Sequence, residues 1–343
     1  MPIKPRLSKE RRAEVHALVS GIWDKVMTPA IDGALKNLRE AKKTAPRTLL
    51  HFTDAAGLVG ILGKDPDTNR KPHLRLCPAR SSNDPTELQY GLDMALKCLQ
   101  GIKTSDEDLW KFKEEIDNSI KGAPFYGRRR DIPDPHICCL THPRRERSIP
   151  QWALYGRNGS GCLIVFRGEE LAKRETIDLV KVDYSAASQS KRMRDTLQRG
   201  LTAAIQGRWE ARKLQILSES AIDRIYRSYA NAFGSIVALQ AAAMKRPEWN
   251  FEDEWRLSIG SVDEPAIGKQ LKTGAFASGS IIKTYFELPI RWTDIDEIIV
   301  GPNVSALNIR AVRMILGMLG HGYRVIPVRQ GDISLRGDRK SVV

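Results

Sequence analysis

Residues 136–141 have the sequence His-Ile-Cys-Cys-Leu-Thr, and from this segment onward short apolar segments dominate the chain. Each has the length of a strand and is bounded by turn-forming residues. Together with two earlier segments, the predicted strands are residues 49–52, 73–77, 136–141, 161–166, 179–184, 255–259, 282–288, 298–301 and 323–328. Most of them follow one another without an intervening helix, which argues against a regular β-α-β sheet. The sequence therefore predicts an α+β fold with a mixed, largely antiparallel sheet and flanking helices.

Two regions around these strands are predicted to be helical. Residues 8–44 carry apolar side chains at three- to four-residue spacing, with a break at Pro29. Residues 186–245 form a second helical region between predicted strands. We therefore expect an N-terminal helical arm at 1–46, an α+β core at 47–330 with a helical insertion at 186–245, and a C-terminal tail at 331–343.

Composition limits the class of protein. The 343 residues are 41% hydrophobic and 28% charged, which excludes a mostly disordered chain. The longest apolar stretch, near residues 235–244, is shorter than the roughly 18–20 residues that span a bilayer. The basic N-terminus lacks the apolar core of a secretory signal. The five cysteines form no C-x-x-C motif and are odd in number. We expect a cytoplasmic protein without disulfides or a membrane partner.

The net charge is 55 − 41 = +14. This charge fits a protein that meets phosphates, an anionic cofactor or nucleic acid, and it equally fits a basic protein without such a partner. Residues 4–43 carry +5, either as the solvated face of a docking helix or as a contact surface. Further basic clusters lie at residues 128–130, 144–147 and 191–199.

Gly156, Gly159 and Gly161 form a G-x-x-G-x-G pattern that is similar to a phosphate-binding loop. The pattern precedes a predicted strand, whereas phosphate loops lead from a strand into a helix. We therefore expect a turn at this position.

A possible set of metal ligands, at first sight, is formed by His136, Cys138, Cys139 and His142. On a strand, however, Cys139 points away from His136 and Cys138, and no second ligand pair has zinc-site spacing. We expect buried strand cysteines and no metal.

The segment Phe251-Glu252-Asp253-Glu254-Trp255-Arg256 carries the strongest chemical pattern. On a strand, Glu252, Glu254 and Arg256 share one face. Burying these charges is costly unless they pair with each other or meet a ligand. The segment is therefore either a surface ion-pair ladder or part of a site.

Three more segments have residues unusual for ordinary packing: His51-Phe52-Thr53, the polar turn at residues 81–87, and Trp152-Ala153-Leu154-Tyr155-Gly156. Each has a structural alternative, namely a satisfied histidine, a good helix start and core aromatics.

Taken together, the four segments resemble an uncharacterised bacterial domain family with the motifs H-Y-T, S-x-N-D-x-x-E, W-x-x-Y-G and E-x-E-W-R. The chain matches them at residues 51–53, 81–87, 152–156 and 252–256, with Phe52 in place of the tyrosine. The resemblance covers roughly residues 48–330.

More distantly, the motif set is similar to the ADP-ribosyltransferase fold, which has a split sheet. This resemblance implies that His51 binds a ribose of NAD, that Tyr155 stacks on nicotinamide, and that Glu254 is the catalytic carboxylate. It further implies that Glu252 orients the acceptor. Cleavage of the nicotinamide–ribose bond passes through an oxocarbenium-like state, which a carboxylate stabilises. No metal is expected.

The same resemblance assigns the other motif residues to NAD binding. Arg256 is expected to pair with Glu254 and keep it ionised. The remaining candidates for binding the cofactor are Thr53, Arg80, Ser81, Asn83 and Trp152.

The first functional hypothesis is an NAD-dependent ADP-ribosyltransferase or NAD glycohydrolase, with a nucleic-acid or protein acceptor in the first case. By analogy alone, this activity suits a bacterial toxin or phage-defence effector. The alternatives are a non-enzymatic nucleic-acid-binding module, which the charge favours, and a metal-dependent nuclease using Asp84, Glu87, Glu252 and Glu254.

Overall fold

The computed structural model describes residues 9–63, 71–82, 84, 86–122, 134–175, 177–213, 218–259, 271–278, 281–320 and 326–333. The chain divides into two compact units. The helical unit comprises residues 1–37, 85–134 and 185–244, and the sheet unit comprises residues 38–84, 135–184 and 245–343. The sequence prediction had placed residues 85–134 in the core domain, whereas the structure places them in the helical unit.

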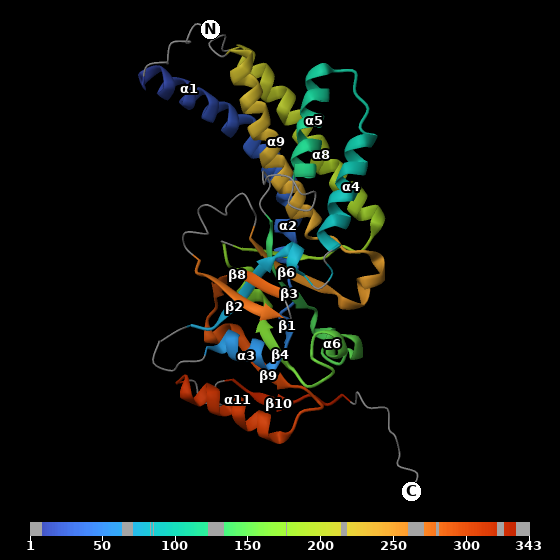
Figure 1. Cartoon of the computed structure of the whole chain (residues 1–343), viewed down its shortest axis with the longest axis vertical. Helices are drawn as coiled ribbons and strands as arrows, with labels where there is room; N and C mark the ends of the chain where they lie inside the picture. Colours follow the sequence, from blue (N-terminus) through green and yellow to red (C-terminus); the bar gives the residue numbers. More distant parts are fainter. Residues whose placement is uncertain are drawn as a thin grey trace. The chain divides into compact units, whose positions relative to one another are not determined.

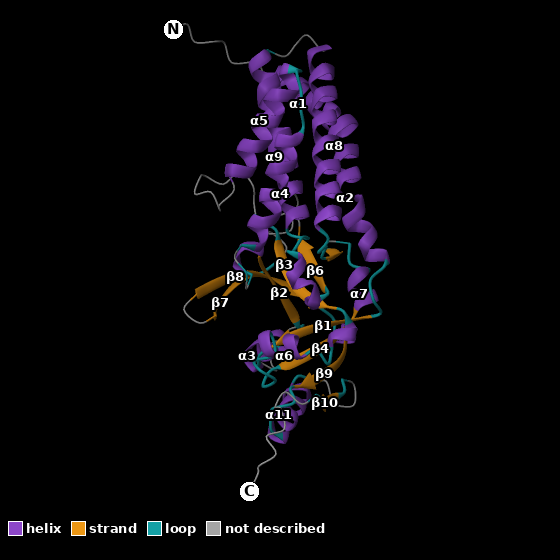
Figure 2. Cartoon of the chain, turned by 90° about the vertical axis from the view of Figure 1, so that its right-hand side faces the viewer, coloured by secondary structure: helices purple, strands orange, loops and turns teal. Residues whose placement is uncertain are grey.

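The helical unit is built from long helices whose bounds are α1 Lys9–Ile22, α4 Glu87–Gly101, α5 Glu107–Gly122, α8 Ala186–Lys213 and α9 Glu219–Ala241. A π-helical turn, η1 Trp23–Met27, joins α1 to α2 Thr28–Lys43, so the predicted break falls just before Pro29. Helices α4, α5, α8 and α9 pack against one another side by side (Figure 2). The region predicted to be helical, 186–245, contains α8 and α9.

The sheet unit contains a ten-stranded sheet (Figure 1). The strands are β1 Thr48–Thr53, β2 His73–Pro78, β3 His136–Thr141, β4 Cys162–Arg167, β5 Asp178–Lys181, β6 Glu254–Ile259, β7 Thr273–Ser278, β8 Ile281–Pro289, β9 Ile295–Val300 and β10 Val328–Gln330. Their order is β10-β9-β4-β1-β3-β2-β8-β7, with β6 between β3 and β5. Only the β9–β10 pair among the described strands is parallel. The predicted α+β class with a mixed, largely antiparallel sheet is therefore confirmed.

Strand β3 is the point at which the sheet branches. It pairs with β6 along its whole length, from His136 opposite Ile259 to Thr141 opposite Glu254. At its other edge it pairs with β2 near its first residue and with β1 only at Thr141, opposite Leu50. Thr141, the last residue of β3, therefore lies between Glu254 at the start of β6 and Leu50 of β1.

The two faces of the sheet bury different apolar clusters. The larger cluster includes Leu49, Ile164 and Trp255, with side chains from α3 Ala55–Leu62 and α11 Ala306–Met318. The smaller cluster includes Leu50, Leu163, Val165 and Ile299 with Trp152 of α6 Ile149–Leu154. A short helix, α7 Gly168–Ala172, follows β4. None of the described helices is long and apolar enough to cross a membrane.

Candidate functional site

Strand β6 begins at Glu254 and is buried throughout. Glu254 and Arg256 share one face, while Trp255 and Leu257 belong to the large core on the other. This alternation is the predicted one. The Arg256 guanidinium binds the Glu254 carboxylate twice, with Nε 2.8 Å from Oε1 and Nη2 3.1 Å from Oε2. Arg256 therefore orients the carboxylate at the start of the strand.

Glu252 does not lie on the strand, so that part of the prediction is wrong. It ends the 3₁₀ helix η6 Pro247–Glu252, and Asp253 adopts a left-handed backbone with φ 49°. The Thr141 hydroxyl and the Gln151 amide both donate to the Glu252 carbonyl oxygen. These bonds from β3 and α6 fix the turn formed by Glu252 and Asp253. The Glu252 side chain thereby stays close to Glu254, and both carboxylates contact Lys245.

Lys245 joins the two carboxylates. Its Nζ lies 2.7 Å from Glu254 Oε2 and also donates to Glu252 Oε2. All three side chains are buried. No sequence pattern pointed to Lys245, because it follows an apolar helix and lies outside every motif. With Arg256, it completes a buried cluster of two cations and two carboxylates, which we call the carboxylate cluster.

The cluster separates the pKa values of its two carboxyl groups. Burial alone would raise the pKa of Glu254, but the charges of Arg256 and Lys245 outweigh burial and hold that pKa well below its usual range. Burial and the charge of Glu254 raise the pKa of Glu252, against the opposing effect of Lys245. Glu254 is therefore firmly ionised, and Glu252 takes up a proton more easily.

Two tyrosines contact the carboxylate cluster. The Tyr155 hydroxyl donates to Glu252 Oε1. The Tyr184 hydroxyl accepts a hydrogen bond from the Glu254 backbone N–H at 3.0 Å. Burial, and then the charges of Glu252 and Glu254 respectively, raise both tyrosine pKa values. Both phenols therefore stay protonated at neutral pH. Tyr155 is a predicted site residue, while Tyr184 was missed because no motif contains it.

Cys139 lies on β3 opposite Arg256 and is exposed, so the expectation that it is buried is wrong. By register it shares the face of the sheet that carries Glu254 and Arg256. Cys139 therefore lies beside the cluster. Cys138, by contrast, is buried as predicted.

His51 and Thr53 occupy the other face of the sheet by register. Leu50 pairs with Thr141, which in turn pairs with Glu254, so these three residues share a face. His51 lies opposite Ile164 of the large core instead. Its Nδ1 bonds the Cys139 carbonyl oxygen at 2.9 Å, and burial lowers its pKa. The structure therefore does not bring His51 and Glu254 to one face.

Trp152 is a core residue. It is 1% exposed, and its indole N–H donates to the Glu146 carbonyl oxygen at 2.7 Å. The Phe52 ring meets it edge-to-face, with centroids 5.1 Å apart. Trp152 therefore supports α6, which carries Tyr155 at its end, and its ring and its N–H are both engaged within the protein.

Arg80 and Ser81 lie in η3 Ala79–Ser81, directly after β2. Their neighbour Pro78 pairs with His136, five residues along β3 from the Thr141 that pairs with Glu254. Pro78 therefore lies at the opposite end of β3 from the residue that pairs with Glu254. Asn83 lies outside the described residues.

The predicted glycine turn is confirmed. Residues 155–160 form turns, and Arg157, Asn158 and Gly159 all have positive φ angles. Gly161 packs so closely on the Thr53 carbonyl that a Cβ there would overlap it. The turn therefore connects α6 to β4 by close backbone approach.

The other hypotheses rest on metal-binding carboxylates and on the basic clusters. Within the described ranges, no group of three His, Cys, Asp or Glu side chains is placed to hold a metal ion. In the basic cluster 144–147, Arg144 pairs with Asp253 and Arg147 with Asp332, while Glu146 pairs with Arg329. Two of the three arginines in this cluster are therefore paired with aspartates. Residues 128–130 lie outside the described residues.

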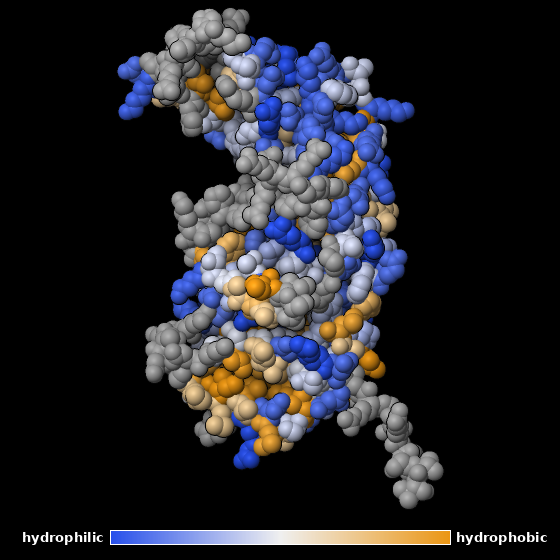
Figure 3. Space-filling model, viewed as in Figure 1, coloured by the Kyte–Doolittle hydropathy of each residue, from blue (hydrophilic) through white to orange (hydrophobic). Residues whose placement is uncertain are grey.

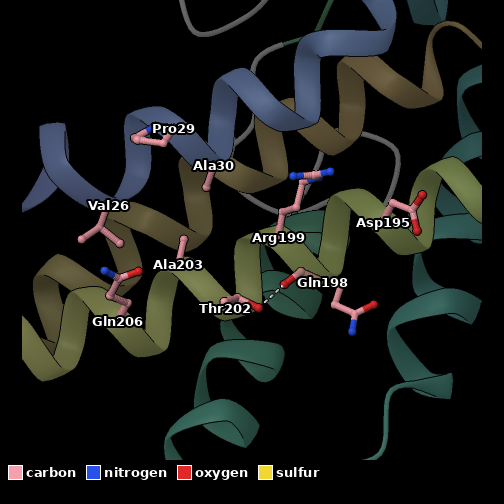
Figure 4. A pocket seen from close by; sticks show the side chains of 9 residues that line it. All are labelled: Val26, Pro29, Ala30, Asp195, Gln198, Arg199, Thr202, Ala203 and Gln206. Carbon is pink, nitrogen blue, oxygen red and sulfur yellow. Dashed lines mark hydrogen bonds between the residues drawn. The ribbon is translucent and has the colours of Figure 1, made fainter.

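The helical unit has a pocket of its own, about 410 Å³ in volume, between the α2 and α8 segments (Figure 4). Val26, Pro29 and Ala30 line it from one side, and the Arg199 side chain extends from α8 towards them. No predicted site residue lines it, so the pocket is separate from the carboxylate cluster.

Fold and site together define an α+β protein with a buried carboxylate–cation cluster at the start of a central strand. Residues 151–257 match a family model described as "Protein of unknown function (DUF2971)". The predicted resemblance to an uncharacterised family is confirmed over this segment, which contains the motifs at Trp152 and Glu252. Comparisons with curated proteins and with solved structures give no match. The resemblance to the ADP-ribosyltransferase fold stays a prediction.

Proposed function

We propose that the carboxylate cluster cleaves the nicotinamide–ribose bond of NAD, as an ADP-ribosyltransferase or an NAD glycohydrolase. One observation carries this proposal: Lys245 contacts both buried carboxylates, while Arg256 binds Glu254 through two nitrogens. This arrangement lowers the pKa of Glu254, whereas burial and the charge of Glu254 raise the pKa of Glu252. Neighbouring carboxyl groups with separated pKa values are typical of sites that divide electrostatic and acid–base work.

In this proposal Glu254 supplies the fixed negative charge. Bond cleavage builds positive charge on the ribose, and an oriented carboxylate in a water-poor site stabilises that charge strongly. Arg256 and Lys245 keep Glu254 ionised and fixed in position. Glu252, held by Tyr155, orients the acceptor and accepts its proton. The acceptor is water in a glycohydrolase and a macromolecular group in a transferase.

The proposal assigns no ribose-binding role to His51 or Thr53, because their register places them on the face opposite Glu254. It also does not use the buried ring of Trp152. The proposed site therefore uses fewer residues than the resemblance implied. It consists of the carboxylate cluster and Tyr155.

The test is to incubate the protein with NAD labelled in its adenylate part, separately with RNA, DNA and protein fractions. Released nicotinamide and transferred label are measured. Glu254→Gln should lower turnover by about 10²–10³-fold. Asp294→Asn is the matched control, because Asp294 is fully buried and pairs with Arg174 outside the cluster. If the wild-type protein consumes no NAD, or Glu254→Gln retains turnover, the proposal is wrong.

A further inference from the structure

Strands β8 and β7, which follow β2 in the strand order, carry a pair of aromatic rings on one face (Figure 2). Tyr285 of β8 is paired with Gly274 of β7, and Phe276 lies two residues further along β7, so both rings project from the same face. The ring centroids are 5.8 Å apart, and the Tyr285 ring packs on Gly274, where a Cβ would overlap it. Both rings are partly exposed, and neither belongs to the two apolar clusters of the sheet. The pair is therefore a surface feature and not part of the core.

Arg75 of β2 reaches both rings. Its guanidinium carbon lies 4.8 Å from the centre of the Phe276 ring and 5.0 Å from that of Tyr285. The guanidinium also lies against Gly60 of α3, where a Cβ would overlap it. In the part of the chain that the structure describes, Arg75 has no ion pair, and its buried Nε has no hydrogen-bond partner. Cation–π contacts therefore hold Arg75 beside the rings, and its charge is not neutralised by a carboxylate.

Two lysines lie on the same face as the rings. Lys283 of β8 is paired with Phe276, and its ammonium donates to the Ser81 carbonyl oxygen at 2.6 Å. This contact orients the charge of Lys283 without neutralising it. Lys272 lies four residues before Phe276, an even spacing that places it on the same face, and its side chain is exposed.

Glu287 supplies the negative charge on this face. It is paired with Arg75 across the strands, and its carboxylate lies 3.9 Å from His73 Nε2. Its backbone N–H donates to the Lys272 carbonyl oxygen at 2.7 Å, so the pairing of β8 with β7 extends to Lys272. Among the described residues, this face of β2, β8 and β7 thus carries three cations and one carboxylate. We use the name β8 platform for the group Arg75, Lys272, Phe276, Lys283 and Tyr285.

We propose that the β8 platform binds single-stranded nucleic acid, with a base stacked on an aromatic ring and the neighbouring phosphates held by the cations. Aromatic side chains on a sheet face stack the unpaired bases of single strands, and nearby basic groups bind the backbone. The register fits this arrangement, because Lys283 precedes Tyr285 by two residues on β8, while Arg75 is paired two residues after it. A nucleotide strand likewise has a phosphate on each side of every base. The charges and rings therefore match a strand of nucleotides better than an isolated phosphate.

The β8 platform differs from the apolar surface over α11. Figure 3 shows apolar residues gathered there, and Leu307, Met314 and Met318 are exposed. An apolar surface does not identify its partner, whereas rings between cations match both the base and the phosphate of a nucleotide. The platform contains no residue of the carboxylate cluster, so this inference does not depend on the proposed function.

Fluorescence anisotropy of labelled single-stranded RNA and DNA oligonucleotides with the full chain tests the proposal. Tyr285→Ala should weaken binding about 5- to 150-fold, the effect of losing one stacked base. Tyr285→Phe keeps the ring and should bind as the wild type does. Trp209→Ala is the matched control and should also leave binding unchanged, because Trp209 is an exposed ring of the helical unit with the Lys213 ammonium 3.0 Å from its centre. Equal losses for Tyr285→Ala and Trp209→Ala would overturn the proposal.

The salt dependence of binding tests the cations and does not require the Tyr285→Ala variant to fold. Lys283→Gln should reduce the slope of log affinity against log salt concentration by about 0.7. Lys25→Gln is the control and should leave the slope unchanged, because Lys25 is exposed and pairs with Glu210 in the helical unit. A wild-type protein that binds neither RNA nor DNA single strands at low salt would overturn the proposal. So would a duplex of the same sequence that binds as tightly as the single strand, since its paired bases cannot stack on the rings.

Discussion

Arg256 holds the carboxylate of Glu254 from two residues away on the same strand, through nitrogen–oxygen contacts of 2.8 Å and 3.1 Å. Side chains two residues apart on a strand project from one face, so β6 alone supplies both partners. Lys245 and Glu252 add one charge of each sign. The four buried charges therefore sum to zero, which reduces the cost of removing them from water.

Arg256→Ala should strongly destabilise the sheet unit. The substitution leaves Glu254 buried with one cation fewer, and breaking a buried pair in this way costs about 3–5 kcal/mol. Urea unfolding of the wild-type protein and the variant measures the difference. Arg167→Ala is the control, because Arg167 and its partner Asp296 are both about half exposed. An exposed pair contributes at most about 1 kcal/mol. Equal losses for the two variants would show that the cluster is not an interdependent buried group.

Gly161→Ala should also destabilise the sheet unit, for a steric reason. A Cβ at Gly161 would overlap the Thr53 carbonyl and also press on the Gly156 backbone, neither of which moves cheaply. We expect a loss of about 1–3 kcal/mol in urea unfolding, within the range of strained backbone substitutions. Gly21→Ala in α1 is the control. A Cβ there meets nothing within 4 Å in the described structure, and alanine favours a helix by about 0.5–1 kcal/mol. A neutral Gly161→Ala would contradict the close approach of the two strands.

The sheet was predictable because its strands are apolar and bounded by turn residues. Strand β7 was missed, since Thr273-Gly-Ala-Phe-Ala-Ser278 is mostly small residues at the end of the strand order, where little apolar burial is needed. The division into units was not predictable in the same way. Helices α4 and α5 contact α8 and α9, which lie far from them in sequence, and local periodicity does not encode such contacts.

The candidate site was predictable only in its strand portion. The two-residue alternation of side chains on a strand correctly predicted that Glu254 and Arg256 share one face. The same period failed at Glu252, because the left-handed Asp253 interrupts the strand just after it. Lys245 reaches the carboxylates through the η6 turn, a tertiary contact that no local pattern marks.

The pH dependence of stability should reveal the lowered pKa of Glu254. In an unfolded chain the pKa of a glutamate is about 4.3. Because its pKa is lower in the folded protein, ionised Glu254 contributes stability above that pH, and the contribution is lost as the pH falls towards the folded value. Glu252 acts in the opposite direction, since its raised pKa makes its ionised form a cost of folding at neutral pH. The two carboxyl groups should therefore give opposite slopes.

Urea unfolding of the wild-type protein and Glu254→Gln at a series of pH values between about 3 and 7 measures this effect. The wild-type advantage should be largest near neutral pH and should shrink as the pH falls below about 4. Glu252→Gln is the counterpart variant, and it should lose less stability than Glu254→Gln at neutral pH. A Glu254→Gln deficit that stays constant over the whole pH range would mean that the Glu254 pKa is not lowered by Arg256 and Lys245. The proposal for Glu254 as a firmly ionised carboxylate would then lose its physical basis.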